Sequence, residues 1–340
     1  MTNKIRVLIV DDSPLFVKAI EEILNTEDFE VVGTSYDAFD AGDKLIKLKP
    51  DVVTLDVEMP KMTGIEFLKL LLPKYPVPVV MVSSASGSVF DAINAGAVDF
   101  VEKPSGLNKE NISLFKSELI TKIKIASIAV LGKKTNNNVN TISRLNSPQK
   151  NDIIIAMGAS TGGTEAIEQI LRAFPKEMPG IVIVQHMPPV FTQIYAKRLN
   201  SICEMEIVEA SDGDLILPGK VLIAPGGKQL SISKSGLKPT VHCYNGEKVN
   251  GLAPSVDVTF NSMADIIGGR SLGVLLTGMG KDGAKGLLEM KKKGAYTIAQ
   301  DEKSCIVYGM PKEAISLGAA KKISPLDNIA EEIIKALQNL

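Results

Sequence analysis

The sequence predicts an α/β protein of two successive domains, each built on a parallel sheet. Short apolar runs alternate with amphipathic segments up to residue 124, a polar stretch interrupts the pattern, and the alternation resumes at residue 152. Strands of a parallel sheet are buried on both faces and are joined by helices, which produces this alternation. The chain has 340 residues, 45% of them hydrophobic, and therefore has enough apolar side chains for two cores.

The first domain, residues 1–124, contains five β-α repeats. The apolar runs predict strands at 5–10, 30–33, 51–55, 78–82 and 99–101. The amphipathic segments predict helices at 14–24, 37–47, 62–72, 88–95 and 108–124. Such repeats imply a five-stranded parallel sheet that is covered by helices on both faces.

Residues 125–151 are predicted to be a flexible linker, because Asn, Lys and Ser replace the apolar periodicity there. The second domain, residues 152–340, has strand-like runs at 152–157, 180–184, 272–276 and 295–299. Between residues 212 and 250, the turn signals LPG, APGG and SKSG instead predict short hairpin strands. We therefore expect a doubly wound parallel α/β domain with a β-hairpin insertion.

Composition argues against several classes of protein. The 38 basic and 39 acidic residues nearly balance and form no basic block, so nucleic acid is not an expected partner. Cys203, Cys243 and Cys305 are widely spaced and lack close metal-ligand partners, which indicates a reducing cytoplasm. A cleavage pattern and an apolar stretch of membrane-spanning length are both absent from the sequence, so we expect neither export nor membrane insertion.

Carboxylates follow two strands of the first predicted sheet. Asp11 and Asp12 follow the first strand, and Asp56 follows the third. Because parallel strands end at the same edge of a sheet, these acids are expected to gather there and to hold a hard cation such as Mg²⁺. Asp56 is then placed to attack a phosphoryl group.

Ser83 and Lys103 end or follow the next two strands, where a hydroxyl and an ammonium can hold phosphoryl oxygens. For Asp11 taken alone, a helix cap or a solvated loop charge is the simpler interpretation. Five such residues at successive strand ends favour a phosphoryl-accepting site instead.

The runs VDDS, DVEMPKMTG, MVSS and FVEKP, in this order, resemble the receiver domain of two-component systems. The resemblance implies a flavodoxin-like fold and phosphorylation of Asp56 by a histidine kinase. It also implies that Asp11, Asp12, Asp56 and the backbone carbonyl of Glu58 bind Mg²⁺. Signalling is expected to pass through the switch residues Ser83 and Phe100, with Lys103 at the phosphoryl group.

The second domain carries a candidate nucleophile in GASTGGTEAI. Ser160 lies where a strand turns into a helix, so helix N-terminal amides are expected beside its hydroxyl. A helix-capping serine is the alternative, which a lone G-x-S-x-G pattern does not exclude.

A serine nucleophile needs a base, and His186 and His242 are the two histidines of the sequence. His186 follows the strand at 180–184, whereas His242 lies inside an alternating stretch of the expected hairpin, so His186 is preferred. Asp282, beyond the strand at 272–276, reaches the same sheet edge and can hold the imidazole.

The segments GASTGGTEAI, QHMPP, IAPGG, PSVDV, TGMGKDGA and IAQDEKSCIVYGMP together resemble the catalytic domain of chemotaxis protein-glutamate methylesterases. The resemblance implies that Ser160 is the nucleophile, His186 the general base and Asp282 the orienting acid. Thr161 and the backbone N–H of Met279 are the implied oxyanion contacts. One departure is Leu252–Ala253 before PSVDV, where the family pattern has His or Arg beside the proline.

The implied activity is hydrolysis of glutamate γ-methyl esters on methyl-accepting chemotaxis receptors, with deamidation of receptor glutamines as a second reaction. No cofactor is expected for ester hydrolysis. Two other classes remain as alternatives. One is a non-catalytic scaffold that binds receptors under receiver control, and the other is a regulator with a DNA-binding output, for which the second domain lacks a basic helix pair.

Overall fold

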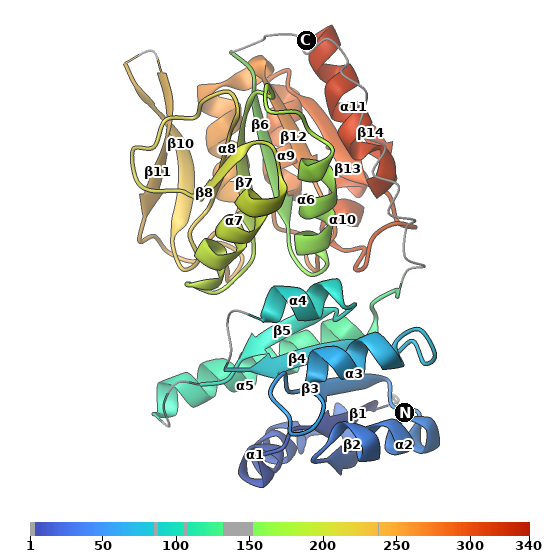
Figure 1. The fold of residues 1–340 in the computed structure, drawn as a ribbon. Coiled ribbons are helices and arrows are strands. Elements are labelled where there is room, and N and C mark those ends of the chain that lie inside the picture. The colour runs from blue at the N-terminus through green and yellow to red at the C-terminus, as the bar shows by residue number, and fades with distance from the viewer. Residues whose placement is uncertain (1–3, 85–87, 105, 107, 132–151, 237) are drawn as a thin grey trace. The chain divides into compact units, whose positions relative to one another are not determined.

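The computed structural model describes residues 4–84, 88–104, 106, 108–131, 152–236 and 238–340 (Figure 1). The chain forms two compact units, Met1–Leu131 and Gly132–Leu340, and each is described by itself. Most of the predicted linker, from residue 132 onwards, lies outside the described residues. Among the described helices none is long and apolar enough to cross a membrane.

Strands and helices alternate throughout the first unit. The elements are β1 (Ile5–Val10), α1 (Pro14–Leu24), β2 (Phe29–Ser35), α2 (Ala38–Leu48), β3 (Val52–Leu55), α3 (Gly64–Leu71), β4 (Val79–Ser83), α4 (Val89–Asn94), β5 (Asp99–Glu102) and α5 (Lys109–Ser127). Side chains set the helix starts: Ser13 caps α1, and Thr63 forms a capping box with Glu66 at α3. Helix α5 continues past residue 124 into the segment predicted as linker.

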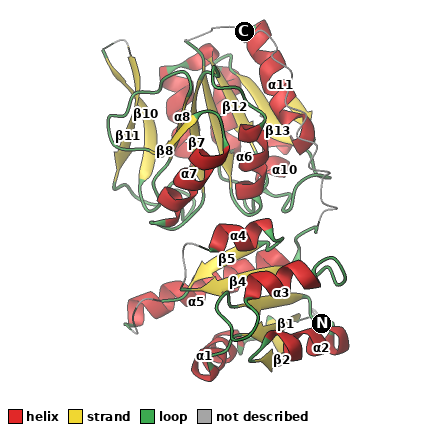
Figure 2. Ribbon diagram, in the orientation of Figure 1, coloured by secondary structure: helices red, strands yellow, loops and turns green. Residues whose placement is uncertain are grey.

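Among the described residues, the first unit forms a five-stranded parallel sheet in the order β2-β1-β3-β4-β5, as the sequence predicted. This is the flavodoxin-like strand order, in which ligands bind at the carboxyl ends of the strands. Every residue of β3 and β4 is buried, since helices cover both faces of the sheet (Figure 2).

The second unit is larger and also mainly parallel. Its elements are β6 (Ile154–Ala159), α6 (Gly163–Arg172), β7 (Gly180–Gln185), α7 (Phe191–Ile202), β8 (Glu206–Glu209), β9 (Lys220–Ile223), β10 (Gln229–Ser235), β11 (Lys238–Tyr244), α8 (Val256–Ile266), the 3₁₀ turn η1 (Gly268–Arg270), β12 (Ser271–Leu275), α9 (Ala284–Lys292), β13 (Tyr296–Gln300), α10 (Met310–Ser316), β14 (Lys322–Ser324) and α11 (Leu326–Asn339).

In the described part of this unit, seven parallel strands follow the order β14-β13-β12-β6-β7-β9-β8, and β10 and β11 form a separate antiparallel hairpin. The central strands β6, β7 and β12 are wholly buried. On the flanks of the sheet, α8 packs against α9 and α6 packs against α11. The predicted insertion is therefore present as the β10–β11 hairpin.

The prediction for residues 212–250 was wrong in one part. Strand β9 falls in this section but joins the main sheet, parallel to both β7 and β8. Its apolar run KVLI has the character of a buried parallel strand, but the turn signals LPG and APGG on either side suggested hairpins throughout. Turn residues mark where a strand ends and do not specify which sheet it enters.

Candidate functional site

Ser160 lies in the sharp turn between β6 and α6. Its backbone N–H donates to Thr277 O (3.0 Å), and its carbonyl accepts from Gly163 N–H (2.7 Å). The N-cap residue of α6 is Gly162, with φ 77° and no side-chain capping bond. The serine is therefore not the cap of this helix, and the capping alternative is wrong for it.

His186 follows β7 directly, on the neighbouring strand. Its backbone N–H donates to Ala159 O (3.1 Å), which places the histidine beside the residue that precedes Ser160. The ring Nε2 lies 2.8 Å from Oδ2 of Asp282, and the two side chains are 10% and 2% exposed. With an ionised Asp282, Nε2 carries the proton and Nδ1 is the basic nitrogen.

Asp282 is held by hydrogen-bond donors on both carboxylate oxygens. Both carboxylate oxygens accept hydrogen bonds from groups on the segment around the start of α8, and His186 adds another. Besides His186, the donors are Ser255 Oγ (2.7 Å), Val256 N–H (2.6 Å), Asp257 N–H (3.3 Å) and Asn250 Nδ2 (3.0 Å). Burial alone would raise the pKa of Asp282, but the bonds from His186, Ser255 and Asn250 lower it below its ordinary value. The carboxylate is therefore ionised and fixed in position.

A second carboxylate, Asp257, lies behind the first. It accepts from Gly286 N–H (2.8 Å) and from Asn250 Nδ2 (3.1 Å), so one amide group bridges the two acids. Burial raises the pKa of Asp257, and the charge of Asp282 adds to this. Asp282 is thus the carboxylate that contacts His186, and Asp257 lies behind it through the shared Asn250 amide.

The loop between β12 and α9 closes the other side of the site. Thr277 Oγ1 donates to Thr161 O (3.1 Å), and Val307 N–H donates to Thr277 Oγ1 (3.0 Å), so this loop ties the serine turn to residues 304–309. A Cβ on Gly278 would lie 2.6 Å from the Cβ of Ser160, which shows how closely the loop approaches the serine. Thr161 is buried, whereas Met279 is 44% exposed at the rim.

His242 lies away from this network, on the exposed hairpin. Its Nδ1 lies 2.7 Å from Oδ1 of Asp212, and its ring stacks on Tyr244. Its carboxylate partner is therefore a surface aspartate, while Asp282 pairs with His186. The structure pairs His186 with Asp282, and it places Ser160 at the end of the neighbouring strand.

The first unit gathers its acids at the carboxyl edge of β1 and β3. Asp11, Asp12 and Asp56 can each offer a carboxylate oxygen, and these oxygens lie within 4.8 Å of one another. Lys103 Nζ lies 2.7 Å from both Asp11 Oδ2 and Asp56 Oδ2. Clustered hard oxygen donors suit Mg²⁺, so the residues present fit the ion that the resemblance implies.

Burial and crowding shape the charges of this acidic cluster. Burial raises the pKa of Asp11 despite the hydrogen bond from Lys103, and the charge of Asp56 contributes to the rise. Burial alone would lower the pKa of Lys103, but the two carboxylates raise it. Asp11 is not the helix cap either, since Ser13 takes that place and donates its N–H to Asp11 Oδ1 (3.0 Å).

The other residues predicted for the first unit lie at or near the same edge. Ser83 ends β4 and is buried, and its carbonyl accepts from Lys103 N–H (3.0 Å). Glu58 N–H donates to Asp56 Oδ1 (3.3 Å), so the loop after β3 folds back over Asp56. Phe100 in β5 is buried, with its ring 6.5 Å from that of Phe90.

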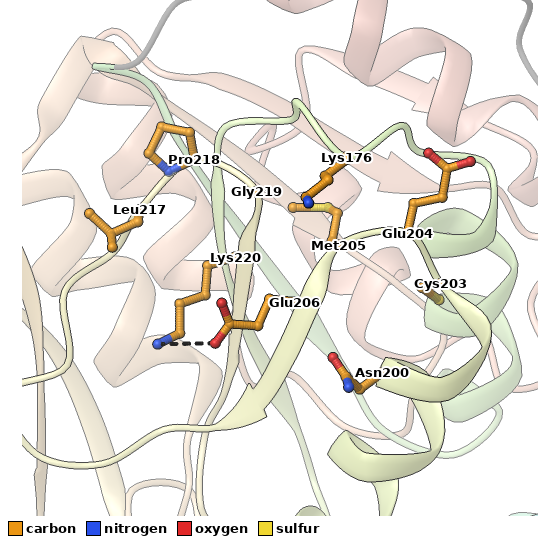
Figure 3. A pocket seen from close by; sticks show the side chains of 10 residues that line it. All are labelled: Lys176, Asn200, Cys203, Glu204, Met205, Glu206, Leu217, Pro218, Gly219 and Lys220. Atoms are coloured by element: carbon orange, nitrogen blue, oxygen red, sulfur yellow. Dashed lines mark ion pairs between the residues drawn. The ribbon is translucent and has the colours of Figure 1, made fainter.

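A cavity of about 380 Å³ lies elsewhere in the second unit (Figure 3). Lys220 and Glu206, which begin β9 and β8, line it and form an ion pair (3.7 Å). Cys203 also lines it, but burial raises the pKa of its thiol to about 11, so it is not a reactive thiolate. Because Lys220 and Glu206 begin their strands, the cavity belongs to the opposite sheet edge from the serine, and we assign it no catalytic role.

Sequence reasoning missed the residues that support the site. Ser255, Asn250 and Gln185 contact Asp282, Ser160 or His186, yet no pattern singled them out. Two of them lie in or next to segments that carry the family resemblance: Ser255 is part of PSVDV, and Gln185 directly precedes His186 in QHMPP. Their roles depend on which atoms meet in three dimensions.

Comparisons with known proteins match both units. Residues 155–333 match the CheB methylesterase family model, and residues 7–112 match the response regulator receiver domain model. The chain is 52% identical over 343 residues to the Syntrophomonas wolfei protein-glutamate methylesterase/protein-glutamine glutaminase 2, with 99% of each chain covered. The chain belongs to the CheB methylesterase family.

More distant relatives give the same assignment. A Yersinia pestis protein-glutamate methylesterase/protein-glutamine glutaminase is 43% identical over 342 residues, with 99% of this chain and 98% of that one covered. The crystal structure of the Thermotoga maritima CheB methylesterase catalytic domain covers 54% of this chain and 98% of its own, with 40% identity and a TM-score of 0.53. The predicted family, fold class and hydrolase activity are confirmed, and the chain is a chemotaxis methylesterase with a receiver domain.

Proposed function

We propose that Ser160, His186 and Asp282 hydrolyse γ-methyl esters of glutamate side chains on methyl-accepting chemotaxis receptors. The observation that supports this most directly is the His186–Asp282 contact of 2.8 Å at the strand end next to Ser160. A buried, ionised carboxylate on one imidazole nitrogen leaves the other nitrogen basic, as a serine nucleophile requires.

The reaction has two halves. Ser160 Oγ attacks the ester carbonyl carbon while His186 takes the hydroxyl proton, and the tetrahedral intermediate collapses to an acyl-enzyme as His186 returns that proton to the departing methanol. Water, deprotonated by His186, then attacks the acyl carbon and frees glutamate and Ser160. Asp282 keeps its charge throughout and stabilises the imidazolium.

The oxyanion is assigned to Thr161 and the backbone N–H of Met279. The support is that Thr161 follows the nucleophile directly and that the loop containing Met279 approaches Ser160 at Gly278. A glutamine γ-carboxamide gives the same kind of intermediate with ammonia as the leaving group, so deamidation is the proposed second activity.

The receiver domain is proposed to control this reaction through Asp56, phosphorylated by a chemotaxis histidine kinase. Asp11, Asp12, Asp56 and the carbonyl of Glu58 would hold Mg²⁺, which supplies charge neutralisation for phosphoryl oxygens when bound. Lys103 contacts Asp56 (2.7 Å) and is placed to hold the added phosphoryl group, while Ser83 and Phe100 relay the change. We propose that the protein works in the cytoplasm, as its cysteine usage predicts.

The test is methanol release from methylated receptors by the wild-type chain and by Ser160→Ala. The variant is expected to lose activity a thousandfold or more while keeping its fold, since one small turn residue replaces another. Labelling by a serine-directed fluorophosphonate, located by mass spectrometry, should modify Ser160 in the wild type. Activity in Ser160→Ala above about a hundredth of wild type would contradict Ser160 as the single serine nucleophile.

A further inference from the structure

Gln185 is the last residue of β7 and directly precedes His186, and its side-chain amide contacts the backbone of Ser160 and of His186. The side chain is buried, with the residue 3% exposed. Its Nε2 donates to the carbonyl of Ser160 (2.9 Å) and to the carbonyl of His186 (3.2 Å). One amide group therefore joins the residue that carries the nucleophile to the residue that carries the base.

The chemistry of the contacts fixes the orientation of this amide. If the side chain were turned over, its oxygen would face two carbonyl oxygens, and both contacts would be repulsive. The two N–H groups of Nε2 match the two carbonyls. The glutamine thus acts as a donor at this place and cannot be replaced by an acceptor of the same shape.

The other end of the same side chain is poorly satisfied. Oε1 of Gln185 is buried and has no hydrogen-bond partner within the described part of the chain. A Cβ on Gly163 would lie 2.2 Å from this oxygen, so the glycine at the start of α6 leaves the space that the amide fills. Burying a polar atom without a partner is unfavourable, and an apolar side chain of similar size would avoid this.

Two other buried glutamines of the same unit show the contrast. Gln229 Oε1 accepts from Ser255 N–H (2.9 Å), and Gln300 Oε1 accepts from Thr277 N–H (2.8 Å), while each Nε2 also donates to backbone carbonyls. Both amides are used at both ends. Gln185 is used at its Nε2 end, and that end contacts the two catalytic residues.

We propose that Gln185 is a positioning residue that sets the distance and orientation between Ser160 and His186. This inference rests on the proposed function of those two residues. By holding both carbonyls, the amide restrains the two strand-end turns relative to each other, beyond the strand pairing that ends at Ala159 and Gln185. A displacement of about 1 Å at a reacting group can lower a rate on the order of a hundredfold, so such a restraint affects the chemical step.

The test compares two variants. Gln185→Met keeps the size of the side chain and removes its N–H donors. Gln185→Glu keeps the shape of the side chain and has no donor when the carboxyl is ionised. Gln169→Met is the matched control, because it removes a glutamine bond to Asp327 (2.7 Å) on the outer side of α6. In the full-length chain, kcat for methanol release from methylated receptor membranes is expected to fall about tenfold or more in both Gln185 variants. KM should stay within twofold, and Gln169→Met should match wild type.

Further measurements separate positioning from folding. The rate of Ser160 labelling by the fluorophosphonate should fall in parallel with kcat, and the thermal midpoint of the second unit should stay near that of wild type. Unchanged kcat and labelling in either folded variant would overturn the proposal, as would failure of both variants to fold. If activity instead falls in proportion to the unfolded fraction and is regained when the variant refolds on cooling, Gln185 is a structural residue only.

The two proposals fail in different ways. If wild-type Ser160 is not labelled and Ser160→Ala stays active, the proposed function is wrong whatever Gln185 does. If Ser160 is labelled and required but Gln185→Met reacts at the wild-type rate, only the positioning role is wrong.

Discussion

Two carboxylate sites lie at the carboxyl edges of two parallel sheets in one chain, and their surroundings are opposite. Asp282 in the second unit accepts hydrogen bonds from four side-chain and backbone groups besides His186, and its pKa is lowered. Asp11 in the first unit lies beside Asp12 and Asp56, and burial raises its pKa. The hydrogen-bond donors around Asp282 already balance its charge. The cluster around Asp11 instead concentrates negative charge that a cation can neutralise.

This difference matches two kinds of task. A catalytic acid that orients an imidazole must be fixed and charged before the substrate arrives, because preorganised charges need no rearrangement during the reaction. A phosphorylation switch must change its conformation when an ion and a phosphoryl group bind, so repulsion among its carboxylates is useful. Lys103 contacts both Asp11 and Asp56 and offsets part of this repulsion.

The largest expected effect tests which histidine serves the complete site. His186→Gln should reduce methanol release on the order of 10⁶-fold, since a triad without its base keeps little more than binding and oxyanion contacts. His242→Gln, the matched control on the exposed hairpin, should stay within about threefold of wild type, as surface changes do. Equal losses in two variants with unchanged circular dichroism would show that the base is assigned wrongly.

Replacing an aspartate by asparagine should change the free energy of unfolding in opposite directions at the two sites. Asp282→Asn places an amide among donors that face a carboxylate, so the second unit should lose about 3 kcal/mol of unfolding free energy, with activity down about 10⁴-fold. Asp11→Asn removes one of the crowded charges and leaves the Lys103–Asp56 pair, so the first unit should become more stable.

Scanning calorimetry of the full chain is the measurement, with one transition assigned to each unit through these variants. Destabilisation of the first unit by Asp11→Asn would mean that Asp11 stabilises the fold in its charged form. The crowded charges of the receiver domain would then not be a source of instability.

The pH dependence of stability should differ between the units in the same way. The lowered pKa of Asp282 means that its contribution is present above the ordinary value of 3.8 and is lost as pH falls through the folded-state pKa. The raised pKa of Asp11 means that the folded first unit binds a proton more readily than the unfolded chain does. Its stability should therefore rise as pH falls from the folded-state pKa toward 3.8.

The measurement is the difference in free energy of unfolding between wild type and each Asp→Asn variant, from pH 7 down to about pH 3. At pH 7 the wild type should be more stable than Asp282→Asn and less stable than Asp11→Asn. Both differences should shrink as pH falls. Parallel curves for a wild type and its variant would show that the aspartate has no shifted pKa.

The sequence predicted the parts of this molecule that depend on periodicity and on strand ends. Apolar runs located the strands of both sheets, and the shared carboxyl edge brought Ser160 and His186 onto adjacent strands. The sequence did not reveal that β9 joins the main sheet, because a short apolar run carries no mark of its neighbours. It also did not reveal Ser255 as a donor to Asp282, since that contact joins residues 27 positions apart through side-chain geometry.

The smallest expected effect concerns one donor of the complete site. Ser255→Ala removes the 2.7 Å bond to Asp282, while Ser271→Ala removes a buried serine bond to Gly268 O (2.6 Å) elsewhere in the unit. Each should cost about 1 kcal/mol of unfolding free energy. Only Ser255→Ala should raise the pKa of Asp282, and activity should fall less than tenfold because the other donors remain.

The measurement that distinguishes these serine variants is the pH at which the free energy of unfolding begins to fall on acidification. This pH should be higher than in wild type for Ser255→Ala and unchanged for Ser271→Ala. A shift in both, or in neither, would show that Ser255 does not act through the charge of Asp282.

The central claim is that a switchable acid site in one unit governs a preorganised serine site in the other. The direct test is the initial rate of methanol release from methylated receptors, with Mg²⁺ present, before and after addition of acetyl phosphate. The wild-type rate should rise on treatment, Asp56→Asn should stay at the untreated rate because its amide cannot accept the phosphoryl group, and Ser160→Ala should be inactive in both conditions. A rise of equal size in Asp56→Asn, or a wild-type rate that acetyl phosphate leaves unchanged, would contradict the account.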